Sequence, residues 1–391
     1  MAKPKIRFNG YTEDWEQRKL GDIATFINGR AYSQEELLSS GKYKVLRVGN
    51  FYTNDSWYYS DMELEDKYYA EEGDLLYTWS ATFGPHIWHG DKIIYHYHIW
   101  KVELSDTLEK HFAVQLLEKD KQSILSDKNG STMVHITKAG MESKEVMLPP
   151  NIREQAEIGK YLQNIDHLIT LHQRKCEQTK TLKKYMLQKM FPQDGEKVPQ
   201  IRFEGFTEDW EQRKLGDLTK ELSDYATMAS GLPLLTSSRS GLMYQSDFRD
   251  RKTTTSDETL FSIVPKGSCT YRHMSDDDIF HLNINVLEKG LVSREYPVFI
   301  SSEDNDLEFI IQHINSSDRF RGFCKGQKKG GTRTRLYYKT LCEFEMMTPL
   351  IEEQKKISAT LHNLDHLITL HQRKCDELKE VKKFMLQNMF V

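Results

Sequence analysis

The chain contains 391 residues, of which 38% are hydrophobic, 29% charged and 11% aromatic, and its formal net charge at pH 7 is -4. These values predict two or three soluble globular domains, and they exclude a mini-protein and a disordered chain. Since no apolar run is long enough to cross a membrane and the first residues lack the apolar core of a signal peptide, we expect a cytoplasmic protein.

The chain begins with a motif that it later repeats. The segment IRFNGYTEDWEQRKLGDI at 6–23 returns at 201–218 as IRFEGFTEDWEQRKLGDL, and 15 of the 18 positions are identical. An internal repeat of this kind indicates that one structural plan occurs twice. We expect the motif to form the entrance to each copy, with Trp15 and Trp210 as core anchors.

Two divergent regions of similar length, 24–147 and 219–347, follow the two copies of this motif. Alternating runs at 43–51, 92–104 and 296–300, bounded by Gly, Asn, Asp and Ser, predict strands. We expect each region to form a mixed α/β domain with largely antiparallel strands. The two domains would then share a fold and differ on the surface.

Four histidines of the first divergent region, His86, His89, His96 and His98, form a candidate metal cluster. His96 and His98 lie two residues apart in an alternating run, so one face of a strand could present both as ligands. The second copy has no matching cluster, and a histidine in an aromatic strand is often a hydrogen-bonded sheet residue. We predict the structural role and no metal site.

Each divergent region is followed by a segment that predicts a long helix. From 152 to 191, Gly159 is the only Gly or Pro, and apolar residues recur in alternating steps of four and three that return after 349. This is the pattern of a coiled-coil seam, and two near-identical helices pack most easily antiparallel. His172 and His371 lie on the seam, where they either meet near the axis or stay solvated.

Signatures of catalysis are absent from the sequence. It contains no phosphate-binding loop, dinucleotide-binding motif, serine-nucleophile motif or H-E-x-x-H motif, and its only Pro-Pro pair precedes Asn151 in the reverse of the order that an adenine methyltransferase needs. Its five cysteines are scattered without a C-x-x-C pair, which argues against a disulfide framework or a zinc ribbon. The run Asp276, Asp277 and Asp278 could bind a metal, although such a run is more often a solvated turn. We predict no catalytic residue.

The strongest local charge signal is the segment 319–339, which carries eight basic residues and no acidic one. Lys and Arg interleaved with Gly, Thr and aromatic residues are suited to contacts with phosphates and guanine edges. A solvated loop is the alternative, but unneutralised charges at this density would repel one another without a polyanion. We therefore favour nucleic acid. The equivalent segment 126–138 is less basic but rich in Asn, Ser, Thr and His.

The arrangement resembles the specificity subunit of Type I restriction-modification systems. The resemblance covers the whole chain and rests on a doubled W-x-x-x-x-L-G-[DE] motif at 15–22 and 210–217, a doubled P-x-x-x-E-Q helix start at 150–155 and 349–354, and the divergent regions between them. It implies two target-recognition domains, each reading one half of a split DNA sequence. It also implies that two conserved helices fix the spacing and dock methyltransferase subunits.

The expected fold class is α+β, with two similar mixed α/β target-recognition domains separated by two long conserved helices packed as an antiparallel coiled coil, in a pseudo-twofold internal repeat. The expected boundaries are 1–150 for the first target-recognition domain, 151–191 for the first spacer helix, 192–200 for a linker, 201–348 for the second target-recognition domain and 349–391 for the second spacer helix.

The resemblance also implies the partners. They are double-stranded DNA, two methyltransferase subunits and restriction or translocase subunits, with no membrane. The chain itself would bind no cofactor, and S-adenosylmethionine, ATP and magnesium would belong to the partner subunits. A coiled-coil scaffold with two interaction domains and no sequence-specific DNA role is the alternative, and a stand-alone nuclease or an RNA reader is a more distant one.

Alignment of the two halves and residue chemistry give the candidate DNA contacts. In the first domain they are Arg47, Asn50, Thr78, Ser80, Lys128, Asn129, Ser131 and Thr132, and in the second they are Arg239, Arg272, Lys328, Lys329, Thr332, Arg333 and Arg335. Arg47 and Arg239 could instead form ion pairs within their domains.

Overall fold

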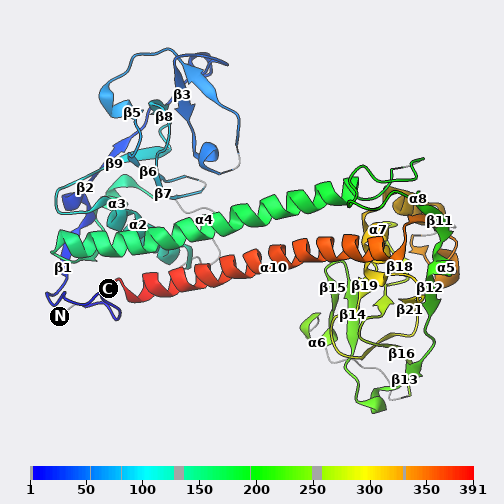
Figure 1. The fold of residues 1–391 in the computed structure, drawn as a ribbon. Helices are drawn as coiled ribbons and strands as arrows, with labels where there is room; N and C mark the ends of the chain where they lie inside the picture. Colours follow the sequence, from blue (N-terminus) through cyan, green and yellow to red (C-terminus); the bar gives the residue numbers. More distant parts are fainter. Residues whose placement is uncertain are drawn as a thin grey trace. The chain divides into compact units, whose positions relative to one another are not determined.

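The computed structural model describes residues 3–52, 54–80, 82–126, 136–193, 195–248, 258–328 and 332–391. The chain divides into two compact units, one formed by 1–174 with 371–391 and the other by 175–370. Two long helices, α4 (Ile152–Lys189) and α10 (Ile351–Asn388), contribute one end to each unit (Figure 1). None of the described helices combines the length and apolar character needed to cross a membrane.

In the first unit, the repeated motif forms the entrance to the globular part. Strand β1 (Glu16–Lys19) pairs antiparallel with β10 (Glu145–Leu148), with Glu16 opposite Leu148, and α1 (Leu20–Ile23) follows. Trp15 is 4% exposed, so the prediction that it anchors the core is confirmed. The strand pair brings the two ends of the divergent region side by side.

The divergent region of the first unit forms two four-stranded sheets. The first is antiparallel in the order β2 (Ala24–Asn28), β9 (Ile99–Leu104), β6 (Leu75–Thr78), β7 (Gly84–Ile87). The second has the order β4 (Tyr58–Ser60), β3 (Tyr43–Leu46), β8 (Ile93–Tyr95), β5 (Tyr69–Ala70), with β3 and β8 parallel. The helical elements are η1 (Gln34–Glu36), η2 (Val48–Phe51), η3 (Asp66–Tyr68), α2 (Lys110–Ser126) and α3 (Lys138–Glu142).

Two of the strand predictions in this region are too long. The run 92–104 is not one strand, because β8 ends at Tyr95 and β9 begins at Ile99, whose N–H donates to the carbonyl of His96 at 2.9 Å. His96 and His98 therefore lie at the turn between two strands, and the expectation that they share a strand face is wrong. Likewise, the run 43–51 leaves the sheet after β3 and continues as η2.

The second unit repeats the plan. Strand β11 (Glu211–Lys214) pairs with β23 (Glu345–Thr348) in the register of β1 and β10, and Trp210 is 2% exposed. The order β12 (Thr219–Glu221), β21 (Val298–Ser301), β17 (Cys269–Thr270), β19 (Asn283–Ile284) reproduces the first sheet of the other unit. The prediction of a shared fold with largely antiparallel strands is thus confirmed.

The remaining strands of the second unit are short. They form a three-stranded sheet of β13 (Tyr225–Ala226), β16 (Phe261–Val264) and β20 (Gly290–Ser293), a hairpin of β14 (Leu235–Ser238) and β15 (Gly241–Tyr244), and a pair of β18 (Met274–Ser275) and β22 (Thr334–Arg335). The helical elements are α5 (Leu215–Leu218), η4 (Met228–Ser230), α6 (Gln245–Phe248), α7 (Leu307–Ser316), α8 (Asp318–Gly326) and α9 (Tyr338–Leu341).

Both long helices complete the cores of the globular parts. In the first unit, the core includes Leu162 near the start of α4 and Phe390 just beyond the end of α10. In the second unit, it includes Phe191 just beyond the end of α4 and Leu361 near the start of α10. The last residues of the chain therefore belong to the core of the first unit.

Within each unit the two helices pack antiparallel along the predicted seam. In the first unit, Lys382 Nζ lies 2.6 Å from Asp166 Oδ1, and the Nδ1 atoms of His172 and His371 lie 3.0 Å apart, so the sequence positions run in opposite directions. In the second unit, Lys183 Nζ lies 2.6 Å from Asp365 Oδ2. The two seam histidines meet, which decides between the alternatives left open by the sequence.

The glutamate of each P-x-x-x-E-Q helix start forms a buried ion pair with the N-terminal motif of its unit. Arg7 donates from Nε and Nη2 to the two carboxylate oxygens of Glu154 at 2.7 and 2.8 Å, and Arg202 binds Glu353 in the same way at 2.8 Å. Glu154 and Glu353 are 0% and 1% exposed. These bidentate pairs join the repeated motif, 6–23 or 201–218, to the first turn of α4 or α10.

We expect the substitution Glu154→Gln to lower the free energy of unfolding of the first unit by about 2 kcal/mol, because a buried guanidinium loses its charged acceptor. The matched control is Glu157→Gln, since Glu157 is exposed and binds only the exposed Tyr11 hydroxyl in the described part of the chain. Denaturant unfolding measures both. Equal stability of the two variants would contradict the role given to the pair.

Candidate nucleic-acid interface

The described parts of the basic segment 319–339, which leave out 329–331, are largely folded and do not form one solvated loop. Its first part forms α8, which Ser317 caps by accepting a hydrogen bond from the Phe320 N–H at 3.2 Å. Phe320 and Cys324 bury one face of this helix, at 2% and 1% exposure. The basic side chains are therefore held on a folded support.

The expectation that the basic charges of this segment are unneutralised is wrong for four of the eight residues. Arg321 pairs with Asp318 at 2.9 Å, and Arg319 lies 3.9 Å from Glu345. Arg333 Nε donates to Asp276 Oδ1 at 2.7 Å, and Lys328 Nζ lies 3.7 Å from Asp278 Oδ1. Acidic residues that lie 3, 26, 50 and 57 positions away in the chain thus pair with four of the eight basic residues of the segment.

The run Asp276, Asp277 and Asp278, which we call the acidic turn, binds basic side chains from three segments. Lys328 follows the end of α8, Arg333 directly precedes β22, and Arg239, from the β14–β15 turn, pairs with Asp277. The residues that the structure describes contain no group of acidic, histidine and cysteine side chains suited to a metal ion. The pairs with Arg239, Lys328 and Arg333 make the acidic turn an ion-pairing element.

Buried polar contacts fix the shape of the acidic turn. Ser275, 6% exposed, donates to Asp277 Oδ1 at 2.8 Å and accepts from the N–H of Ile279 at 3.1 Å. The hydroxyl of Thr334, 1% exposed, donates to Asp278. Asp278 has φ of +62°, a left-handed conformation that is uncommon for a residue other than glycine.

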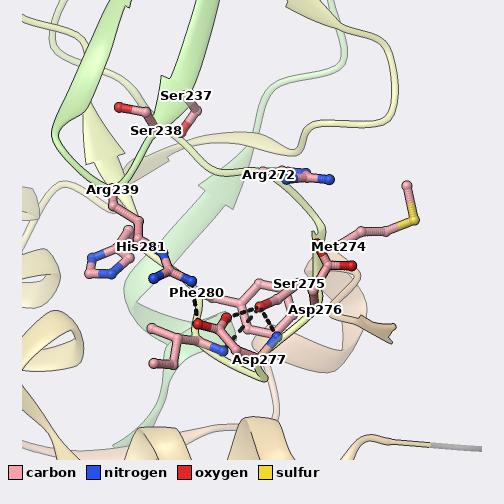
Figure 2. A pocket seen from close by; sticks show the side chains of 11 residues that line it. Ser237, Ser238, Arg239, Arg272, Met274, Ser275, Asp276, Asp277, Phe280 and His281 are labelled. Atoms are coloured by element: carbon pink, nitrogen blue, oxygen red, sulfur yellow. Dashed lines mark hydrogen bonds and ion pairs between the residues drawn. The ribbon is translucent and has the colours of Figure 1, made fainter. Parts of the chain in front are cut away.

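A pocket of about 130 Å³ lies between the acidic turn and the end of β14. Figure 2 shows Arg239 pointing toward Asp277, with Ser275 beside the carboxylate and Arg272 on another side of the pocket. The hydrogen bond from Ser275, with a further contribution from Arg239, lowers the pKa of Asp277, so this carboxylate is ionised at neutral pH. The pocket is therefore lined by an ionised carboxylate that pairs with Arg239 and by a second guanidinium group, that of Arg272.

The structure gathers most of the predicted contacts of the second domain in this area. Arg239 and Arg333 have side chains that are 65% and 54% exposed, and Lys328 is 40% exposed. Arg272, Thr332 and Arg335 are also exposed, and Arg335 lies opposite Met274 in the β18–β22 pair. The predicted residue Lys329 lies outside the described residues.

Two features of this area are missing from the sequence analysis: the ion pairs of the acidic turn with basic side chains, and an exposed aromatic ring, that of Tyr337. Tyr337 is 50% exposed and stacks on His273 with ring centroids 5.7 Å apart. The sequence held one usable signal, because three consecutive carboxylates in the same domain complement a segment with eight basic residues. In the sequence, this run predicts only a candidate metal site or a solvated turn.

In the first domain, two of the predicted DNA contacts have structural positions. Asn50 accepts from the Arg47 N–H with Oδ1, and its Nδ2 donates to the carbonyls of Asn54 and Ser56, so its amide holds the loop together. Thr78 is 0% exposed, which is the opposite of what a DNA contact requires. Burial therefore speaks against Thr78 as a DNA contact, and the local hydrogen bonds of the half-buried Asn50 give its amide a structural role.

The other predicted contacts of the first domain are placed unevenly. Arg47 is half-buried, with its guanidinium 4.2 Å from the centroid of the Tyr58 ring and Nη2 3.3 Å from the Ser56 carbonyl, so it makes local contacts in place of the ion pair considered above. Ser80 is half-buried. The predicted residues Lys128, Asn129, Ser131 and Thr132 lie outside the described residues.

A stacked histidine occupies the neighbourhood of these residues. His86 lies on the ring of Phe51 with centroids 4.0 Å apart and planes at 12°, and its Nε2 is 3.1 Å from the hydroxyl of Tyr52, which is 42% exposed. Burial, with a smaller effect of Lys121, lowers the pKa of His86 to about 4. The imidazole is therefore neutral at pH 7.

This histidine predicts a pH dependence of stability. Because the pKa of His86 is about 4 in the folded chain and about 6.5 when unfolded, its contribution is fully present above pH 6.5 and is lost as the pH falls toward 4. We expect His86→Phe to reduce the loss of stability of the first unit between pH 7 and pH 5, measured by denaturant unfolding. The exposed His167→Gln serves as control, and an unchanged pH dependence in His86→Phe would refute the assignment.

Comparison with known proteins bears on the whole chain. A sequence profile of the family described as Type I restriction modification DNA specificity domain matches residues 12–181 and 281–380. The Type I restriction enzyme MjaVIII specificity subunit of Methanocaldococcus jannaschii is 24% identical, covering 95% of this chain and 91% of its own. The putative type I restriction enzyme MjaX specificity subunit of the same organism is 24% identical, covering 97% and 93%.

A solved structure shares the fold. The crystal structure of the S subunit of a Type-I restriction-modification system from M. genitalium matches with a TM-score of 0.68 and 14% sequence identity, over 100% of this chain and 99% of that chain. The expected fold class is confirmed.

Proposed function

Because this chain belongs to the Type I restriction-modification DNA specificity family, whose role is the recognition of a DNA target, we propose that each of its two units reads one half of a split DNA sequence. The observation that carries this proposal is the doubled plan. The entrance pairs β1–β10 and β11–β23 share one register, whereas the exposed residues between them differ. A conserved support with divergent surfaces suits a reader of two different half-sites.

The proposal assigns the spacing of the half-sites to the long helices. Helices α4 and α10 have 38 residues each, and each runs without interruption from one unit into the other. At 1.5 Å per residue such a helix is about 57 Å long. Half-site spacing is set by protein geometry in other DNA readers, and helix length plays that part here.

We assign the docking of methyltransferase subunits to exposed apolar residues that recur at equivalent positions of the two helices. Leu168 and Leu367 are both 41% exposed, Leu182 and Val381 are 43% and 41% exposed, and Tyr185 and Phe384 are 49% and 53% exposed. Apolar side chains on a helix surface favour burial against a partner. Two equivalent sets support two methyltransferase subunits on each chain.

The substitution Phe384→Asp is expected to remove one of two bound methyltransferase subunits, and Phe384→Asp with Tyr185→Asp to remove both, because a charge must be desolvated in the apolar contact. Native mass spectrometry of the co-expressed complex counts the subunits. The exposed control Glu380→Gln keeps both. Retention of two subunits by the double variant would exclude this surface.

The proposal leaves all chemistry to the partners. A target adenine is flipped out of the duplex into the active site of a methyltransferase subunit, which binds S-adenosylmethionine, while restriction or translocase subunits use ATP and magnesium. The sequence of this chain carries no motif for these reactions. Its contribution is binding and positioning.

Selection of duplexes from a random DNA pool tests the proposal. The chain is co-purified with its methyltransferase subunit, and the retained DNA is sequenced. We expect a consensus in two parts separated by a fixed spacer, and excess single-stranded RNA does not compete. Retention without any consensus favours the scaffold alternative, and competition by RNA favours an RNA reader.

A further inference from the structure

We propose that the acidic turn of the second unit is a specificity element, in which Asp276 and Asp277 hold Arg333 and Arg239 for contact with guanine edges of the second half-site. This inference rests on the proposed function and adds to it. It assigns to carboxylates a part in reading DNA, and it predicts that the second half-site contains guanine.

The first step concerns the atoms that remain available. Arg333 uses Nε for Asp276, and Arg239 uses Nη2 for Asp277. Within the part of the chain that the structure describes, the Nη1 and Nη2 of Arg333 donate no hydrogen bond, and in Arg239 neither Nη1 nor the second N–H of Nη2 does, so each guanidinium keeps the edge formed by its two terminal nitrogens. A guanidinium has five donors in a rigid fork, so a carboxylate on one edge leaves further donors directed outward. Two such donors match the O6 and N7 acceptors of guanine.

The second step concerns charge. A surface that binds DNA by neutralising phosphates gains from unpaired Lys and Arg, and a carboxylate beside each cation weakens that attraction. Here three consecutive carboxylates stand beside Arg239, Lys328 and Arg333. The arrangement is poor for phosphate binding and suited to base contacts, where direction matters more than net charge.

The third step concerns rigidity. The buried hydroxyl of Ser275 holds the Asp277 carboxylate, and that of Thr334 holds the neighbouring Asp278. The loop that carries Arg239 is held by Asn283, whose Nδ2 donates to Ser237 Oγ and the Ser238 carbonyl at 2.8 Å each. In the Asp277–Arg239 pair, the carboxylate and the loop that carries the arginine are therefore held in place before DNA arrives. Ordering a side chain in advance lowers the entropy lost on binding.

The test uses the full chain co-expressed with its methyltransferase subunit and maps methylated sites in the host DNA, with the variants Asp276→Asn and Asp277→Asn. We expect each variant to keep the first half of the motif and to accept other bases at a guanine position of the second half. In purified complexes, the ratio of cognate to guanine-substituted duplex affinity falls about tenfold. If the carboxylate acted only through its negative charge, its removal would instead raise the affinity for every duplex and leave the ratio of cognate to guanine-substituted affinity unchanged.

The matched control is Asp318→Asn, which removes the same charge from the same unit and breaks the exposed pair with Arg321. It should leave the motif unchanged. If an Asp variant fails to assemble, Arg239→Lys tests the inference in its place. This variant keeps the positive charge but loses the planar guanidinium, and it is expected to accept other bases at the same guanine position as Asp277→Asn. An unchanged second half in Asp276→Asn, Asp277→Asn and Arg239→Lys overturns the inference, whereas absence of a motif from the unaltered chain refutes the proposed function itself.

Discussion

Exchange of residues 219–344 for the corresponding region of another Type I specificity subunit is expected to replace the second half of the methylated motif and to leave the first half and the spacer unchanged. The structure gives the reason. Strands β11 and β23 flank this region and pair with each other, so its two ends lie side by side on a support that the exchange retains. The core of the second unit lies largely within the exchanged segment.

Sequencing of N6-methyladenine in the host DNA measures the outcome. The reciprocal exchange of residues 24–144, between α1 and β10, is the matched control, and it should alter the first half only. A change in both halves after either exchange would mean that the units do not read DNA independently. An unchanged motif would mean that recognition lies elsewhere in the chain.

Truncation of one aromatic residue at the end of the chain should have the largest effect on stability. We expect Phe390→Ala to destabilise the first unit by about 3 to 5 kcal/mol, the usual cost of removing a buried phenyl ring. Phe390 is 4% exposed and packs against Trp15 and Phe112, with ring centroids 6.2 and 5.0 Å away. These contacts join Phe390 to the core of the first unit, most of which is formed by residues 1–174.

Hydrogen exchange measured by mass spectrometry resolves the two units separately. Phe390→Ala should accelerate exchange in the first unit, and Phe191→Ala should do so in the second, because Phe191 packs on Trp210 and Phe309. The control Phe384→Ala, at a 53% exposed position, should change stability by less than about 0.5 kcal/mol. If Phe390→Ala left the first unit as stable as the control does, the shared core would be disproved.

The long helices and their seam could be predicted from the sequence because helical packing leaves a local period. Ile158, Leu162 and Ile165 are buried as the four-and-three pattern predicts, and Ile357 and Leu361 repeat them. The doubled entrance motif likewise predicted the buried tryptophans. In both cases the signal depends on spacing within a short segment or on a comparison of the two halves.

The details of the candidate site depend on contacts that no local pattern encodes. The pairing of Arg333 with Asp276 joins residues 57 positions apart, and it follows only from the arrangement of β18 and β22. In the alignment of GDLLYTWS (73–80) with GSCTYRHM (267–274), Thr78 matches Arg272, yet β6 is buried on both faces while Arg272 is exposed. Two positions that are equivalent in the shared fold can therefore differ in whether their side chains are exposed.

The central claim is that this chain selects a split DNA sequence. It is tested most directly by co-expressing the chain with its methyltransferase subunit and mapping N6-methyladenine across the host DNA by single-molecule sequencing. The account predicts one new motif in two parts with a fixed spacer and a methylated adenine in each half. A methyltransferase that binds this chain but produces no new motif, or only an undivided one, would contradict it.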